Sequence, residues 1–208
     1  MRRVARERFN DFALRSSRRV RLARYEQFID GMSGAICSAW SRWQSQAVLS
    51  GVRVEGKVAS GGKVLGPAWA PLILERVPAG SPWARQHSQV IAQTLGDAWS
   101  AYLASIWVPS MEWYPVLAER TEEAPPVANQ PVPLAALGQV AAGLDKMSLV
   151  SRMAMALGRP LEGLEAEMYE CVTEAFVQSF RRWHAATRVT DVMASGSGLA
   201  VMRAGGFR

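Results

Sequence analysis

Three stretches of the chain repeat large apolar side chains at the spacing of one helix face. They align on Trp40, Trp99 and Phe180, each preceded by a small residue and followed three positions later by another aromatic residue. Further apolar residues stand four and eight positions earlier, so all of them share one stripe of an α-helix. We therefore expect a mainly α fold, in which three amphipathic helices with a shared aromatic motif bury Ile36, Trp40, Trp43, Leu95, Trp99, Tyr102, Val172, Phe176, Phe180 and Trp183.

Either a structural repeat or ordinary amphipathic packing would give this stripe. Each helix leads into a similar exit segment, which could be a short strand or an extended exit. Ser81 and Pro82 give a helix start signal, because serine is favoured at the N-cap and proline at the first helical position. The helices are expected over residues 28–49, 81–107, 148–157 and 162–187, and a further amphipathic helix over residues 3–29.

A β-hairpin is expected over residues 52–65. Val52, Val54 and Val58 alternate with charged residues, which is the period of a half-buried strand. Gly61 and Gly62 are placed to form the turn. Residues 66–71 are expected to be extended, since proline is excluded from helix interiors.

The rest of the chain is divided by composition into segments that cannot pack a core alone. The arm, residues 1–27, is rich in arginine, and the tail, residues 194–208, is rich in glycine. Between them we expect a helical core domain over residues 28–193, which includes a proline-rich connector at residues 108–133. The connector also carries Trp113 and Tyr114, and rings of this size favour packing against a surface. The tail is expected to be disordered or ordered only by a partner.

The net charge is +6, and the arm concentrates the basic residues. Guanidinium groups bind carboxylates and phosphates in a bidentate fork, so the arm favours an anionic partner: an acidic protein surface, nucleic acid or an anionic membrane surface. A solvated helix face would give the same composition. The residues expected to bind partners are Arg2, Arg3, Arg6, Arg8, Arg15, Arg18, Arg19, Arg21, Arg24, Trp69, Trp107, Trp113 and Tyr114.

The sequence offers no recognisable chemistry. Neither His87 nor His184 has a second ligand at metal-binding spacing, and His184 is expected to face solvent. Cys37 and Cys171 are expected to be reduced thiols, since one pair is too few for a disulfide framework. Gly61-Gly62-Lys63 lacks the other residues of a phosphate-binding loop. We expect no catalytic residues, no cofactor and no metal, no transmembrane segment, and synthesis in the cytoplasm.

Residues 30–137 contain a series of motifs in a distinctive order. An Ala-Trp-x-x-Trp helix precedes a Gly-Val-x-Val hairpin and the Gly66-Pro67 segment; an Ala-Trp helix, Trp113-Tyr114-Pro115 and the sequence from Asn129 to Leu134 follow. This order resembles small structural proteins of tailed phages and phage-tail-like particles. The arm before residue 30 is not part of that pattern, and the motifs carry no catalytic residue. The resemblance implies a structural or assembly role.

We therefore expect a non-enzymatic assembly subunit of a phage or phage-like particle. Its arm, connector and tail would bind neighbouring subunits in a homo- or hetero-oligomer, because such segments become ordered when they bury surface on a partner. Incorporation into a virion follows from this interpretation. Two alternatives are a nucleic-acid-binding accessory protein that uses the arm, and a small enzyme whose site has no sequence signature.

Overall fold

The computed structural model of the chain describes residues 3–5, 19–115, 126–138, 143–194, 201–203 and 206–207. About 59% of the described residues are helical, which confirms the mainly α character. The chain divides into two compact units. Unit 1 comprises residues 1–43, 68–100 and 142–181; unit 2 comprises residues 44–67, 101–141 and 182–208. This division differs from the consecutive arm, core and tail expected from the sequence, because each unit combines segments that are distant along the chain.

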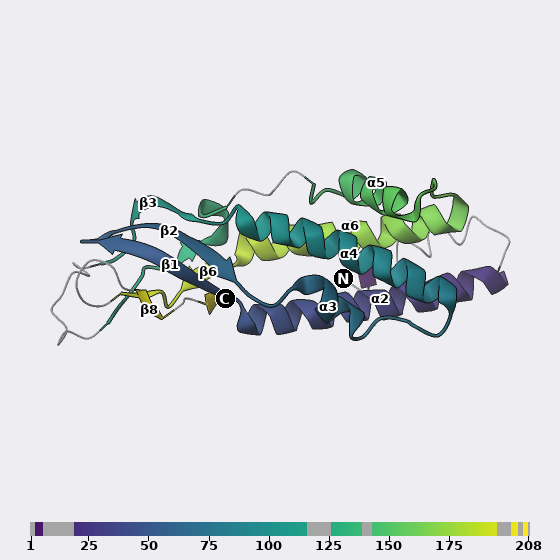
Figure 1. Cartoon of the computed structure of the whole chain (residues 1–208), viewed down its shortest axis with the longest axis horizontal. Helices are drawn as coiled ribbons and strands as arrows, with labels where there is room; N and C mark the ends of the chain where they lie inside the picture. The colour runs from purple at the N-terminus through teal and green to yellow at the C-terminus, as the bar shows by residue number, and fades with distance from the viewer. Residues whose placement is uncertain are drawn as a thin grey trace. The chain divides into compact units, whose positions relative to one another are not determined.

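Unit 1 is helical. It contains most of three long helices, together with two short helices on their surface (Figure 1). Their bounds are α2 (Arg19–Gln46), α3 (Trp69–Leu74), α4 (Pro82–Ala104), α5 (Lys146–Leu157) and α6 (Gly163–Ala186). The ends of α2, α4 and α6 are assigned to unit 2. The three long helices contain the three predicted aromatic stripes.

An aromatic cluster forms the centre of unit 1. The ring of Trp69 lies 4.8 Å from that of Trp99, 5.7 Å from that of Trp40 and 5.5 Å from that of Phe176. Trp43 meets Trp99 edge-on at 4.8 Å. Stacked, tilted and edge-to-face pairs at these distances add stability beyond the area they bury. The residues of the predicted core are all buried except Trp40 and Trp183, which are partly exposed.

The segment that was expected to be extended contains helix α3, so that prediction is wrong for residues 69–71. Pro71 is tolerated because it lies in the first turn, where the backbone N–H has no partner within the helix. The helix packs closely on α4: a Cβ built on Gly96 would lie 2.7 Å from the Cβ of Ala70 and 2.9 Å from its backbone nitrogen. Glycine is therefore required at position 96 for this approach.

Unit 2 contains every strand that the structure describes, in three small antiparallel sheets. The first sheet has the order β1 (Val48–Glu55), β2 (Val58–Leu65) and β3 (Val108–Glu112). The second joins β4 (Val127–Ala128), β7 (Met193–Ala194) and β8 (Val201–Arg203), and the third joins β5 (Val132–Pro133), β6 (Arg188–Thr190) and β9 (Gly206–Phe207). Strands β1, β3 and β6 follow α2, α4 and α6, so each exit segment forms a strand, which was one of the two forms expected.

The hairpin forms, but its turn is not at the predicted glycines. Glu55 pairs with Val58, so Gly56 and Lys57 form the turn, and Gly56 has a φ of 63° that favours glycine. Gly61 and Gly62 lie inside β2 with φ values of 74° and 85°. An irregularity in the pairing of β2 with β3 falls between Ala59 and Gly61. These glycines therefore accommodate a bulge within a strand.

The proline-rich connector is tied into unit 2 by backbone pairing. Asn129 is buried, and its side chain accepts a hydrogen bond from the Val192 N–H at 2.9 Å and donates to the Val189 carbonyl at 3.1 Å. The Tyr114 hydroxyl donates to the Val192 carbonyl at 3.2 Å. These bonds hold β4 and β5 against the segment from β6 to β7.

The glycine-rich tail is ordered in part by the chain itself. Strand β8 pairs with β7, and β9 pairs with β6. At residues 201–203 and 206–207 the structure thus departs from the expectation that only a partner would order the tail. Strands of two or three residues gain little stability alone, but β8 and β9 each pair with a strand that is already held by the connector.

Candidate interaction surfaces

The arginine arm lies mostly outside the described residues. Arg2, Arg6, Arg8, Arg15 and Arg18 are among those not described. Arg3 lies in a helical stretch at residues 3–5, where Ala5 is fully buried. Arg19 and Arg21 belong to the first turn of α2. The Arg24 guanidinium lies 4.2 Å from the centroid of the Trp83 ring, a cation–π geometry.

Three of the four aromatic residues expected at a partner surface lie in the interior instead. Trp69 is buried in unit 1, and Trp113 and Tyr114 are buried in unit 2. Burial raises the pKa of the Tyr114 hydroxyl to about 12. These side chains cannot anchor a partner in the folded state. Trp107 behaves differently, with 56% of its surface exposed.

Trp107 stands beside an uncharged hollow of unit 2 of about 540 Å³. Its neighbours Ile106 and Val108 point into the core, so the alternation at this exit from α4 directs the indole outward. The backbone N–H of Trp107 donates to the carbonyl of Leu137 at 3.0 Å, and this bond holds the backbone in place. The other lining residues are Ala104, Ser105, Pro109, Ala135, Ala136, Leu137 and Gly138. The hollow has no charged side chain in its lining and a large, half-exposed aromatic side chain at its rim.

The floor of this hollow depends on a close backbone approach. A Cβ on Gly138 would lie 2.8 Å from Cγ1 of Ile106. His184, which was expected to face solvent, is instead 7% exposed, with its Nε2 3.3 Å from the Gly138 carbonyl oxygen. Its ring meets that of Tyr102 edge-on at 5.7 Å. The prediction for His184 is wrong because the residue lies four positions after Phe180, on the same buried stripe.

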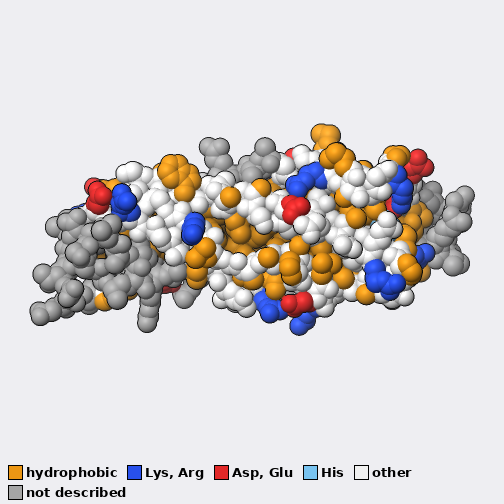
Figure 2. Space-filling model, in the orientation of Figure 1, with side chains coloured by type: hydrophobic (Ala, Val, Ile, Leu, Met, Phe, Trp, Pro, Cys, Tyr) orange, Lys and Arg blue, Asp and Glu red, His pale blue; other side chains and the backbone are white. Residues whose placement is uncertain are grey.

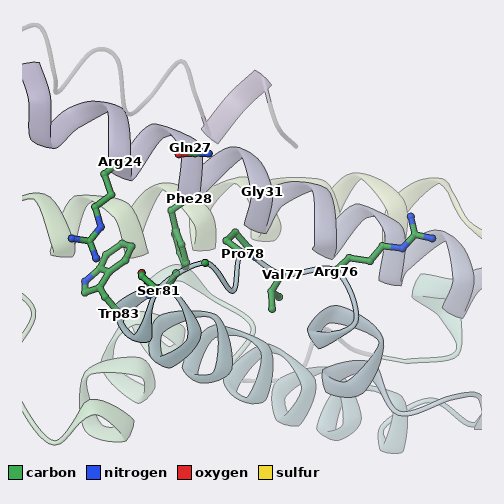
Figure 3. Close-up of a pocket in the computed structure, with 11 residues that line it drawn as sticks. Arg24, Gln27, Phe28, Gly31, Arg76, Val77, Pro78, Ser81 and Trp83 are labelled. Atoms are coloured by element: carbon green, nitrogen blue, oxygen red, sulfur yellow. Dashed lines mark hydrogen bonds between the residues drawn. The ribbon is translucent and has the colours of Figure 1, made fainter.

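A second surface is a groove along α2 in unit 1, made of two hollows of about 400 and 500 Å³. Gly31 and Arg76 line both of them. Figure 3 shows the first hollow, with Arg24 turned onto Trp83 at one end and Arg76 extending outward at the other. Its apolar wall is formed by Phe28, Val77, Pro78, Trp83 and Ala84, and the second hollow is lined by the small residues Gly34, Ala35, Cys37, Ser38 and Ser41.

The loop from α3 to α4 gives the groove its shape. Ser81 accepts a hydrogen bond from the Ala84 N–H at 3.1 Å, which caps α4 as the sequence predicted. Ser88 donates to the Pro78 carbonyl at 3.1 Å, and Arg85 donates to the Ala79 carbonyl at 3.0 Å. A Cβ on Gly31 would lie 2.6 Å from Pro78, so this loop rests directly on α2.

A buried polar network lies deeper in unit 1. The side chain of His87 is fully enclosed, and its Nδ1 is 2.6 Å from the Tyr169 hydroxyl. Its Nε2 is 3.2 Å from Oε1 of Glu165. This is within ion-pair distance, but the angle is not that of a hydrogen bond. Arg159 binds the same carboxylate in a bidentate fork at 2.6 and 2.7 Å. The network therefore joins α4 to the start of α6.

The network favours a neutral imidazole. Desolvation is the main cause that lowers the pKa of His87; the charge of Glu165 opposes this shift, and the charges of Arg159 and Arg24 reinforce it. Burial and the nearby Glu165 raise the pKa of Tyr169. A neutral His87 can accept from the Tyr169 hydroxyl and direct its other N–H toward Glu165. Because His87 is inaccessible to solvent, this arrangement fits a structural link between helices.

No cluster of histidine, cysteine, aspartate and glutamate side chains suited to a metal ion occurs in the described part of the chain. Neither Cys37 nor Cys171 is part of a disulfide in the structure. Among the helices that the structure describes, none is both long and apolar enough to cross a bilayer. No protein-family model matches the sequence, and searches of curated proteins and of solved structures found no match.

Proposed function

We propose that this chain is a structural subunit that assembles with neighbouring subunits, in a particle of the phage or phage-like kind. The observation that carries the proposal is Trp107, a large ring held outward on a fixed backbone beside an uncharged hollow. Tryptophan is enriched among the residues that dominate binding energy at protein interfaces. The resemblance of residues 30–137 to phage structural proteins agrees with this role.

The exposed area of the Trp107 ring sets how much free energy of association this residue is expected to contribute. Tryptophan buries up to about 250 Å² when enclosed, so the 56% still exposed corresponds to about 140 Å². At about 25 cal/mol per Å², burying this area contributes at most about 3.5 kcal/mol. A residue that supplies about 2–3.5 kcal/mol changes a dissociation constant roughly 30- to 300-fold.

The test compares Trp107→Ala with the wild-type chain by sizing chromatography with light scattering over a concentration series. The concentration needed for half-association should rise roughly 30- to 300-fold in the variant. Leu65→Ala is the matched control, since Leu65 is a 43% exposed apolar residue of unit 2 that does not line the hollow. Equal association of Trp107→Ala and wild type would refute the role of this surface.

A further inference from the structure

Helix α5 presents the two most exposed large apolar side chains that the structure describes. Met147 is 77% exposed and Met155 is 71% exposed, and they lie on one face of the helix, two turns apart. Leu149 and Met153 hold the opposite face in the core. Figure 2 shows orange side chains projecting over α5 at the upper edge of unit 1. Flexible methionine side chains suit contacts with irregular hollows.

The spacing of these methionines matches the spacing of the two hollows in the α2 groove. Met147 and Met155 are eight residues apart, which is about 12 Å along a helix. The residues of α2 that line the first hollow centre near Phe28, and those that line the second centre near Ile36. These centres are also about eight residues apart, so each hollow could receive one methionine.

The charges on the two surfaces are also complementary. Arg24 and Arg76 lie at the ends of the first hollow, and Arg42 beyond them is paired with Glu75. The side chains of Glu26 and Asp30 do not line either hollow. Among the described residues, four carboxylates flank α5 against two basic side chains. Glu170 and Glu174 share Lys146, Asp97 lies 3.9 Å from Arg152, and Asp145 caps the helix, so the negative charge around α5 exceeds the positive by two.

The two surfaces lie on different sides of unit 1. Figure 1 shows α5 along its upper edge and α2 along its lower edge. A contact between them must therefore join two copies, each using a different surface. Such a head-to-tail contact repeats from copy to copy and generates a ring or a filament.

We propose that α5 of one copy seats in the α2 groove of the next, with Met147 and Met155 in one hollow each and Arg24 and Arg76 facing carboxylates beside α5. This proposal rests on the proposed assembly function and names a second contact that is distinct from Trp107.

Site-specific cross-linking tests the contact without reference to Trp107. Native Cys37 lines the second hollow and is partly exposed, whereas Cys171 is buried. Mild oxidation joins only cysteines whose Cα atoms come within about 7 Å. Met147→Cys and Met155→Cys are made separately, oxidised and mapped by mass spectrometry. One of the two, and not the other, should form a ladder of multimers joined through Cys37.

The controls make every outcome decisive. Adding Cys37→Ser to the positive variant should abolish the ladder. The proposal would be overturned if neither variant, or both variants, formed a link to Cys37. It would also be overturned if links formed only between two introduced cysteines. If Trp107→Ala impairs assembly while no link to Cys37 forms, the assembly function stands and this contact does not.

An equilibrium test complements the cross-links. Met147→Gln with Met155→Gln keeps helix propensity and side-chain length but removes the apolar ends, so association should weaken at least 10-fold. Met147→Leu with Met155→Leu should retain association. Glutamine and leucine variants with equal association would contradict the contact.

Discussion

The buried His87 network predicts a specific dependence of stability on pH. The groups that face His87 are Arg24 and Phe28 from α2, Trp83 from its own helix, Glu165 and Tyr169 from α6, and Arg159 from the loop before α6. Together they hold its pKa below the ordinary value of 6.5, chiefly through desolvation. In the unfolded chain, His87 takes up a proton near pH 6.5.

The sign follows from this difference. Above pH 6.5 both states carry a neutral His87 and its contribution to stability is complete. As the pH falls below 6.5, the unfolded state binds a proton that the folded state does not, so the free energy of unfolding decreases. One proton changes it by at most about 1.4 kcal/mol per pH unit. Between pH 6.5 and 5.0 the loss is at most about 2 kcal/mol, or roughly 4–8 °C in melting temperature for a chain of this size.

The assay is urea unfolding monitored by circular dichroism from pH 7.5 to pH 5.0, for the wild-type chain and for His87→Gln. Glutamine cannot titrate, but its carbonyl can still accept from the Tyr169 hydroxyl. The wild-type stability should fall more steeply below pH 6.5 than that of the variant. Parallel curves would contradict this prediction, because they would mean that His87 has the same proton affinity in the folded and unfolded states.

Three further predictions concern packing and charge. Gly96→Ala should lower the free energy of unfolding by about 1–3 kcal/mol, because the backbone of Ala70 leaves no room for a methyl group. Gly80→Ala should change the free energy of unfolding little, since nothing lies within 4 Å of the new Cβ. Equal urea midpoints for the two variants would contradict this prediction. Trp69→Ala should cost about 3–5 kcal/mol in the same assay and Trp107→Ala less than about 1 kcal/mol, since the first ring is buried and the second is exposed. Raising the salt from 0.05 to 0.5 M should weaken association measured by light scattering, because it screens Arg24 and Arg76; association that strengthens with salt would argue against their role.

The helical stripes carried most of the predictable information. Apolar spacing indicated the three long helices, and eight of the ten residues of the predicted core are buried. It did not single out other buried residues of these helices, such as Ile29, Ala92 and Tyr169. The same helical spacing could also have predicted that both histidines are buried. His87 lies four residues before Ile91, and His184 lies four residues after Phe180, so each falls on a buried stripe. Periodicity can predict that a histidine is buried, but it cannot identify the partners of that histidine. Tyr169 and Glu165 are 82 and 78 residues from His87 in the sequence and meet it only in the folded unit.

The aromatic surface residues show where composition is insufficient. Trp107 and Trp113 both lie in the region after α4, yet one is exposed and the other enclosed. Strict strand alternation would place the two rings on the same face, because they are six residues apart. Trp113 instead lies just past the end of β3, where its backbone N–H donates to the carbonyl of Lys57 in the hairpin turn. Similarly, the position of the turn depended on the register of β1 with β2, which places Gly61 and Gly62 inside a strand.

The most direct test of the assembly function is the mass of the wild-type chain in solution. Sedimentation equilibrium should be measured from about one to about one hundred micromolar at low salt. Assembly predicts a weight-average mass that rises with concentration to a multiple of the single chain, and a smaller rise for Trp107→Ala. A single species with the mass of one chain over the whole range would contradict the account.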